Sequence, residues 1–241
     1  MRPVLRGPSP QAVDFDDYRD AFAELASRIG MFCSYCERRI ATNLAVEHIQ
    51  PKGLPAYENL KGRWENFLLG CVNCNSTKGQ KDVVLSNVLL PNRDNTAAAY
   101  TYSMDGKVNV EAGLTDAQKQ MANRTLALTG LDKPVNEVLD SNGRLVALDR
   151  VAQRMEIWLM AQDSKNDLKL HTNDAFRRQI AKTAKESGFF SIWMTAFEDD
   201  VSMRKLLILE FAGTASDCFD PDTTKTVSPR PANGLSDGSK I

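Results

Sequence analysis

Four cysteines in two regularly spaced pairs carry the clearest chemical signature in this sequence. Both pairs have the pattern C-x2-C, and they comprise Cys33, Cys36, Cys71 and Cys74. Two such pairs can share one tetrahedral zinc ion, and four thiolates leave that ion no open position for water. The sequence therefore predicts a structural Zn²⁺ site, whose binding supplies folding free energy. A redox motif would need only one pair, and the fifth cysteine, Cys218, is interpreted as a spare thiol.

Three polar residues lie between and directly after these pairs. Glu47 and His48 are adjacent, and Asn75 directly follows Cys74. An imidazole can take a proton from water near neutral pH. Carboxylate and amide oxygens suit a hard divalent cation, which can neutralise charge on a phosphate. A lone histidine is more often structural, but its position between the two cysteine pairs makes this signal specific.

Short elements must position these residues. Residues 45–49, ended by Pro51, and residues 66–69 are strand candidates, and residues 75–81 are a helix candidate. Asn75 and Lys78 are three positions apart and would share one helix face. Neighbours on a strand point to opposite faces, so a strand end or a bend must bring residues 47 and 48 toward one phosphate.

The rest of the chain is predicted to be mostly helical. Apolar residues recur at three- and four-residue spacing, Asp105-Gly106 is a strong hairpin turn, and Thr115 to Gln118 form a capping box. The predicted elements are a helix over 14–29, a hairpin over 100–110, and helices over 115–129, 142–162, 173–187, 191–197 and 201–211. The second histidine, His171, precedes a helix cap and is expected to be exposed.

Composition sets broad limits on the protein class. The chain has 241 residues, 42% of them hydrophobic and 25% charged, which is ordinary for a soluble globular protein. Its net charge of −1 gives no global basic field, so nucleic-acid affinity must come from a local patch or a partner. The sequence shows neither a signal peptide nor a run of about 20 apolar residues. With its paired cysteines, we predict a cytoplasmic protein without a membrane partner.

Three motifs together resemble a known family. Val-Glu-His-Ile-x-Pro-Lys at 46–52, Trp-Glu-Asn-Phe-x-Leu at 64–69 and Cys-x2-Cys-Asn-x2-Lys-Gly at 71–79 resemble an HNH endonuclease with a ββα-metal fold. More narrowly, the chain is similar to the HNH nucleases of Septu-type anti-phage systems and their retron-associated relatives. The motif match covers about residues 33–79. The remaining chain resembles these proteins in length, in its Met-Arg start and in its helical C-terminal half.

The resemblance implies a role for each matched residue. His48 would be the general base, and Glu47 and Asn75 would hold a catalytic Mg²⁺ or Mn²⁺. Asn66 would orient His48 by bonding across the strand turn, and Lys78 would contact phosphate. Position 75 carries Asn where the family name has His, but an amide oxygen still ligates Mg²⁺. Glu in place of Asp at position 47 lengthens that ligand by one methylene, which could shift the metal preference.

The expected fold class is therefore α+β and mostly helical, with a zinc-stapled ββα-metal core. Residues 1–30 are expected to be an extended segment and a helix, and residues 31–95 the HNH core. Residues 96–219 are expected to be a hairpin plus a helical region that docks a partner. Residues 220–241 are rich in Pro, Ser, Thr and Gly and are expected to be a disordered tail.

The resemblance further implies an effector nuclease in a defence complex with an ATPase subunit, acting on DNA or RNA. Two alternatives remain: a stand-alone restriction or homing-type HNH nuclease, and a non-catalytic zinc-stapled nucleic-acid-binding module. Basic residues around the motif offer a local phosphate-binding surface. They are Arg38, Arg39, Lys52, Lys61, Arg63, Lys78 and Lys81. Five acidic residues in the same span make an ordinary solvated surface an equally good interpretation.

Overall fold

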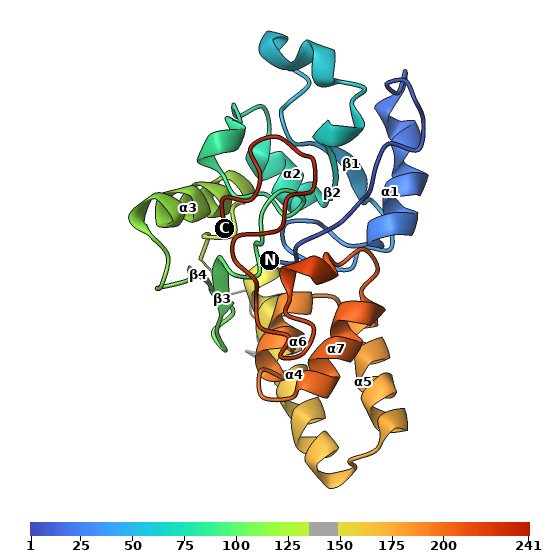
Figure 1. Ribbon diagram of the computed structural model, residues 1–241, viewed down its shortest axis with the longest axis vertical. Helices are drawn as coiled ribbons and strands as arrows, with labels where there is room; N and C mark the ends of the chain where they lie inside the picture. The colour runs from blue at the N-terminus through green and yellow to red at the C-terminus, as the bar shows by residue number, and fades with distance from the viewer. Residues whose placement is uncertain (135–148) are drawn as a thin grey trace, which may run out of the picture.

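A small antiparallel sheet and one short helix form the centre of the upper half of the molecule (Figure 1). The computed structural model describes residues 1–134 and 149–241. Strand β1 (Ala45–His48) pairs with β2 (Phe67–Gly70), and His48 lies opposite Phe67. Helix α2 (Val72–Lys78) follows β2 directly. The predicted order of strand, strand and helix is confirmed, but α2 begins three residues earlier than expected because Cys71 already occupies its N-cap position.

The N-terminal helix packs on this sheet. A 3-10 turn over Tyr18–Asp20 leads into α1 (Ala21–Ile29), which contacts both strands. Leu25 and Ile29 are fully buried, as the apolar spacing predicted. Asp17 accepts a hydrogen bond from Arg19 N at the start of the turn. The predicted helix over 14–29 therefore forms in its second half only.

A hairpin and a capped helix follow the central core. Strands β3 (Tyr100–Tyr102) and β4 (Val108–Val110) pair antiparallel, as predicted. Helix α3 (Asp116–Thr129) begins with both reciprocal bonds of the Thr115–Gln118 capping box. It ends at Gly130, whose φ of 67° is the left-handed conformation that glycine adopts without a side-chain clash.

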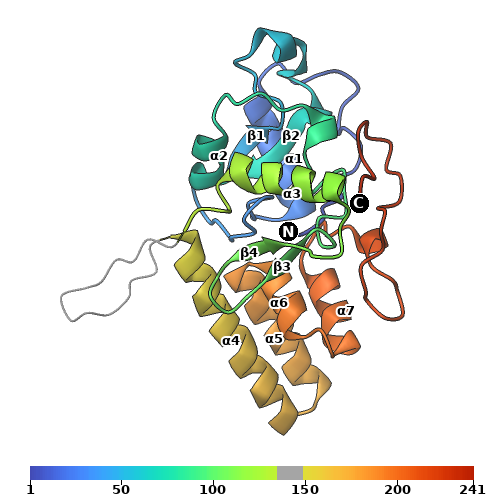
Figure 2. The same ribbon diagram turned by 90° about the vertical axis from the view of Figure 1, so that its left-hand side faces the viewer.

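Four helices form the lower half of the molecule (Figure 2). They are α4 (Arg150–Leu170), α5 (Asp174–Ser187), α6 (Phe190–Ala196) and α7 (Val201–Glu210). The last three confirm the predicted helices. Helix α4 confirms the prediction from residue 150 and extends it to 170, while the predicted start at 142–148 lies outside the described residues. Trp193 and Phe197 stack at 6.5 Å in the fully buried interior of this half.

The C-terminal segment differs from the expected disordered tail. It runs from the helical half back to α3 (Figures 1 and 2), where Gln118 donates a hydrogen bond to Lys240 O at 2.9 Å. The buried guanidinium of Arg230 donates to Pro91 O at 2.9 Å and to Val4 O at 3.0 Å. The segment has few apolar residues, and hydrogen bonds to other parts of the chain, together with the buried Ile241, hold it in place.

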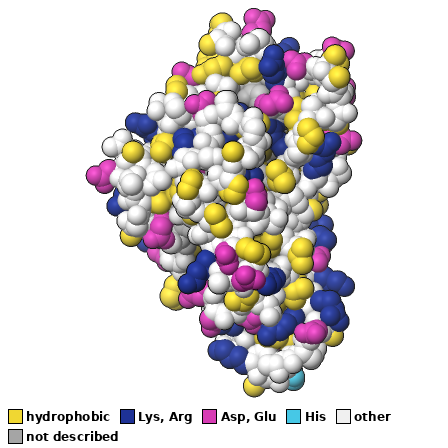
Figure 3. Space-filling model, viewed as in Figure 1, with side chains coloured by type: hydrophobic (Ala, Val, Ile, Leu, Met, Phe, Trp, Pro, Cys, Tyr) yellow, Lys and Arg dark blue, Asp and Glu magenta, His cyan; other side chains and the backbone are white. Residues whose placement is uncertain are grey.

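The surface matches the near-zero net charge. On the face shown in Figure 3, acidic, basic and apolar side chains are interspersed over both halves. Among the described residues, no helix combines the length and the apolar character needed to cross a bilayer. The expected α+β class with a zinc-stapled core and many helices is confirmed.

Candidate active site and metal centre

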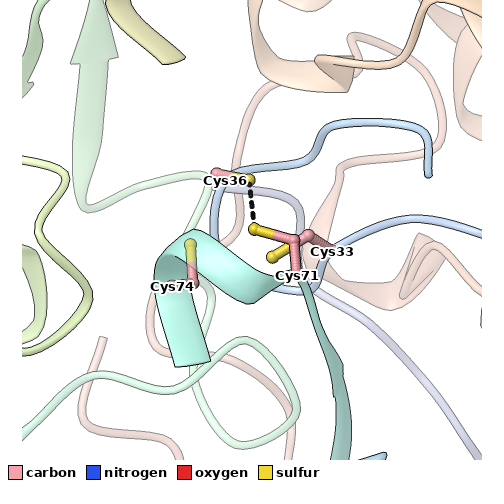
Figure 4. Close-up of side chains that lie close together, drawn as sticks. All are labelled: Cys33, Cys36, Cys71 and Cys74. Carbon is pink, nitrogen blue, oxygen red and sulfur yellow. Dashed lines mark hydrogen bonds between the residues drawn. The ribbon is translucent and has the colours of Figure 1, made fainter. Parts of the chain in front are cut away.

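The four paired cysteines converge on one point between the segment before β1 and the start of α2 (Figure 4). Their Sγ atoms all lie within 4.8 Å of one another, and all four residues are buried. The Sγ atoms of Cys36 and Cys71 are 3.7 Å apart. Sulfurs at the corners of a tetrahedron with Zn–S bonds of about 2.3 Å are about 3.8 Å apart. The donor set and its spacing therefore fit a structural zinc ion.

Cys218 takes no part in this cluster. It is fully buried near the C-terminal segment, and burial raises the pKa of its thiol to about 12. A thiol that stays protonated at neutral pH is a poor nucleophile and a poor metal ligand. Cys218 is thus a buried structural residue, consistent with its interpretation as a spare thiol.

Two arginines contact the cluster, and sequence reasoning did not assign either of them to it. Arg150, at the first position of α4, donates to Cys74 Sγ at 3.0 Å and to Thr129 O at 2.8 Å. Arg38 donates to Cys71 Sγ at 3.4 Å. Burial disfavours the charge of Arg38, but the neighbouring thiolates outweigh that effect and raise its pKa. A zinc ion with four thiolates carries a net charge of −2, which two guanidiniums can balance.

The same arginines join the cluster to the helical half. The other guanidinium nitrogen of Arg150 donates to Gly130 O at 2.5 Å. Arg38 also donates to Gln153 Oε1 of α4 at 3.2 Å and to Asn73 Oδ1 of α2 at 2.6 Å. Arg38 could have been suspected from its place two residues after Cys36. No local signal pointed to Arg150, which lies 76 residues from Cys74 in the sequence.

Glu47 and Asn75 both lie next to Gly70. A Cβ atom built on Gly70 would lie 2.9 Å from Glu47 Cβ and 3.8 Å from Asn75 Cβ, so glycine leaves the two side chains room to approach. The half-buried Asn75 comes from α2, and the buried Glu47 comes from β1. One carboxylate and one amide oxygen are suitable donors for a hard divalent cation, as the resemblance implied.

The carboxylate of Glu47 already has partners in this structure. Its Oε1 lies 2.7 Å from Lys78 Nζ, and its Oε2 accepts a hydrogen bond from Tyr35 at 2.7 Å. Lys78 is 1% exposed and also donates to His48 O at 2.6 Å. Lys78 therefore faces the interior, and the phosphate contact expected of it would require this ion pair to open. A cation bound by Glu47 would take over the charge balance that Lys78 now provides.

The imidazole of His48 has a defined orientation. Its Nε2 lies 2.9 Å from Lys61 O, and its ring packs edge-on against Tyr18 at 4.6 Å and Phe67 at 5.2 Å. A carbonyl oxygen can only accept, so Nε2 carries the proton and the lone pair is on Nδ1. Burial lowers the pKa of His48, partly opposed by the bond to Lys61 O. The ring is thus neutral at pH 7, the state that a general base requires.

Asn66 bonds the backbone beyond β1 and not the imidazole. Its Nδ2 donates to Gln50 O at 2.9 Å and to Leu60 O at 3.3 Å, and its Oδ1 accepts from Gln50 N at 2.8 Å. It therefore ties together the two ends of the loop between β1 and β2. The carbonyl of Lys61, directly after the 3-10 helix Pro55–Leu60 within that loop, is the group that orients His48.

Glu47 and His48 are adjacent on β1, so their side chains point to opposite faces of the strand and have different neighbours. Glu47 contacts Tyr35 and Lys78, whereas His48 contacts Tyr18 and Phe67. The structure thus gathers Glu47, Asn75 and Lys78 in one place and sets the His48 ring among other residues. His171 ends α4 and is exposed, as expected.

The comparison with protein families matches one segment of the chain. Residues 33–81 match the family model described as HNH endonuclease. This segment contains the four cysteines, both central strands, α2 and every residue to which the motifs assigned a role. No curated protein matches the sequence. Residues 33–81 are therefore an HNH endonuclease family domain, built around a four-cysteine centre.

Proposed function

We propose that this protein is a metal-dependent HNH endonuclease that hydrolyses phosphodiester bonds in nucleic acid. The observation that carries the proposal is His48, which is neutral, held by Lys61 O and presents Nδ1 as its basic nitrogen within an HNH domain. Glu47 and Asn75 lie in the same ββα unit and offer oxygen ligands. No other described residue combines these features, since the second histidine is exposed at the end of α4.

Different residues of this domain would carry out different parts of the hydrolysis. Nδ1 of His48 accepts a proton from the attacking water, while Nε2–H stays bonded to Lys61 O and stabilises the imidazolium that forms. Glu47 and Asn75 would hold a Mg²⁺ or Mn²⁺ ion, which supplies neutralisation of the phosphate and of the leaving oxygen. The zinc cysteines position α2, and with it Asn75, against β1.

The first prediction tests this assignment. His48→Ala should lower the rate of Mg²⁺- or Mn²⁺-dependent cleavage of DNA or RNA by about 100-fold or more, because a general base contributes roughly 10² to 10⁴ in rate. Zinc content and circular dichroism should stay unchanged. His171→Ala, which alters the exposed histidine, is the matched control and should cleave like the parent protein. A His48→Ala protein that cuts as fast as the parent would show that the base is another residue.

We further propose that the nuclease is the effector of an anti-phage defence complex with an ATPase subunit, possessing a docking surface within residues 115–212. Support comes from the Septu-type resemblance, from the net charge of −1 and from a helical half that extends beyond the HNH domain (Figure 2). Co-purification of an ATPase with the native protein would support this arrangement. Site-specific cleavage by the isolated chain would instead favour a stand-alone restriction or homing-type nuclease.

One observation favours a second candidate function, a zinc-stapled nucleic-acid-binding module without catalysis. The carboxylate of Glu47, which a catalytic cation would need, already lies in a buried ion pair with Lys78. Binding of Mn²⁺, measured by electron paramagnetic resonance, separates the two candidates. Loss of bound Mn²⁺ on Glu47→Gln substitution supports the nuclease. A protein that binds nucleic acid but neither binds nor uses any divalent cation supports the binding module.

A further inference from the structure

A cavity of about 300 Å³ lies beside the loop that orients His48. Gln50 and Asn66 line one side, and the C-terminal residues Gly234 to Ser236 line another. Two arginines, Arg63 and Arg93, also face it. The cavity is thus closed in part by the segment that sequence composition marked as a disordered tail.

Arg93 is the unusual member of this lining. Its side chain is 95% buried, since the residue is only 5% exposed. In the described part of the chain, its guanidinium makes one hydrogen bond, a long one of 3.5 Å from Nη1 to Glu65 O, and its Nε is buried without a partner. Buried guanidiniums normally have most of their donors satisfied, because unmet donors carry a desolvation cost. Arg93 therefore has unused donors at the cavity.

A second buried arginine adds positive charge behind it. Arg6 donates to the carbonyl oxygens of Trp64, Phe67 and Glu65. Burial, reinforced by repulsion from Arg93, lowers the pKa of Arg6 to about 9, so it remains charged at neutral pH. Among the described residues, no ion pair joins Arg6 or Arg93 to a carboxylate. Glu65, Asp94 and Asp237 attract Arg93 from beyond ion-pair distance. Two adjacent buried cations without a directly paired carboxylate favour an anion in the cavity next to them.

We infer that this cavity binds a phosphate group, with Arg93 as its principal ligand. The source of that phosphate rests on the proposed function: it would belong to a nucleic-acid strand and lie next to the phosphate that is cleaved. Asn66 bonds Gln50 and Leu60 at this wall, and the next residue, Lys61, holds the His48 ring. Leu60, Leu85 and Leu235 give the same cavity an apolar wall suited to a sugar or a base. Glu65 is the acidic lining residue, and its side chain is exposed to solvent.

The test measures binding without added divalent cation, so that no cleavage occurs. Anisotropy of a labelled single-stranded DNA or RNA should show about tenfold weaker binding to Arg93→Gln, and a salt dependence reduced by about one phosphate contact. Arg178→Gln, at an exposed arginine of α5, is the matched control and should bind like the parent. Unchanged oligonucleotide and phosphate binding by a folded Arg93→Gln protein would overturn the inference.

Two further arms separate the sources of the phosphate and guard against misfolding. A rise in melting temperature with inorganic phosphate or a nucleoside monophosphate, lost in Arg93→Gln, indicates a free phosphate ligand; a loss confined to oligonucleotides indicates a strand. If Arg93→Gln does not fold, Leu235→Trp fills the cavity and leaves both arginines in place. Weaker binding by that variant supports the site, and unchanged binding contradicts it. If the protein binds the oligonucleotide through Arg93 but never cleaves it, the proposed nuclease function is wrong while the phosphate site stands.

Discussion

His48 owes its predicted reactivity to its second ring nitrogen and to its burial. Lys61 O fixes the proton on Nε2, so Nδ1 is the nitrogen left to accept one. Burial, the largest influence, lowers the pKa of the ring below its ordinary 6.5. The adjacent Glu47 lies instead in a buried ion pair with Lys78. Neighbouring residues on one strand thus become a neutral base and a paired carboxylate.

The pH dependence of cleavage follows from this lowered pKa. A general base works in its deprotonated form, so kcat/KM should rise with pH and level off above a midpoint that lies below 6.5. Folding stability should also rise with pH. The unfolded state binds the proton of His48 more readily than the folded state, because burial lowers the pKa of the ring in the folded protein. The contribution of His48 to stability is therefore complete above pH 6.5 and is lost as the pH falls below it. A pH profile of single-turnover cleavage tests the first statement. A midpoint above 6.5 would contradict it.

The Glu47–Lys78 pair should couple strongly in stability measurements. Both residues are 1% exposed, so Lys78→Met leaves a buried carboxylate without its cation and should cost about 3–5 kcal/mol. Glu47→Gln combined with Lys78→Met removes both charges and should cost less than Lys78→Met alone. Urea unfolding of the single and double variants gives the coupling energy. Additive losses would show that the two charges do not interact in solution.

At the scale of elements, the four-cysteine cluster connects α2 with two other helices. Cys71 and Cys74 begin α2, and Arg150 begins α4 while bonding the last carbonyl of α3. Helix α2 has only seven residues and could not be stable alone. Its position, and that of Asn75 on it, therefore depends on the four-cysteine cluster and on Arg38 and Arg150.

Zinc retention should depend on Arg150. Arg150→Met removes a donor to Cys74 Sγ and a balancing charge, so zinc affinity should fall by about 10- to 100-fold, as expected for a residue that supports a metal ligand. Release of zinc to a chromophoric chelator measures this effect. The control is Arg178→Met, at an exposed arginine on α5. Equal release rates for all three proteins would mean that the Arg150 contact does not stabilise the site.

At the scale of the whole molecule, the C-terminal segment joins the two halves. It leaves the helical half, passes the cavity at Leu235 and ends at Ile241, whose carbonyl accepts from Asn95 N at 3.0 Å. Arg230 anchors it near the N-terminus through Val4 O. The HNH domain is therefore enclosed by residues from both ends of the described chain.

Arg230 should be important for stability despite its place in a polar segment. Arg230→Met leaves the buried carbonyl oxygen of Val4 without its donor, whereas Pro91 O keeps its hydrogen bond from Val4 N, so the change should cost about 1–3 kcal/mol. Lys225→Met, at an exposed lysine of the same segment, should be nearly neutral. Thermal melts of both variants compare the effects. Equal melting temperatures for Arg230→Met and the parent would mean that this segment detaches in solution.

Local features of this protein were predictable from its sequence. The spacing of the cysteine pairs predicted their cluster, and the Asp105-Gly106 turn and the Thr115–Gln118 capping box predicted the hairpin and α3. Each of these depends on residues close together in the chain, whose backbone geometry limits what they can form. The position of Asn75 after Cys74 likewise pointed to α2 as the helix that carries it.

Only the tertiary structure shows which partners the buried charged side chains bind. Arg150 bonds a sulfur 76 residues away, Lys78 turns inward to Glu47, and Arg230 fastens a segment that composition marked as disordered. Residue type and spacing do not say whether a charged side chain will face solvent or a buried partner. A charged side chain is buried only where a partner offsets the free-energy cost of removing it from water. Such a partner can lie far away in the sequence and comes close only when the chain folds.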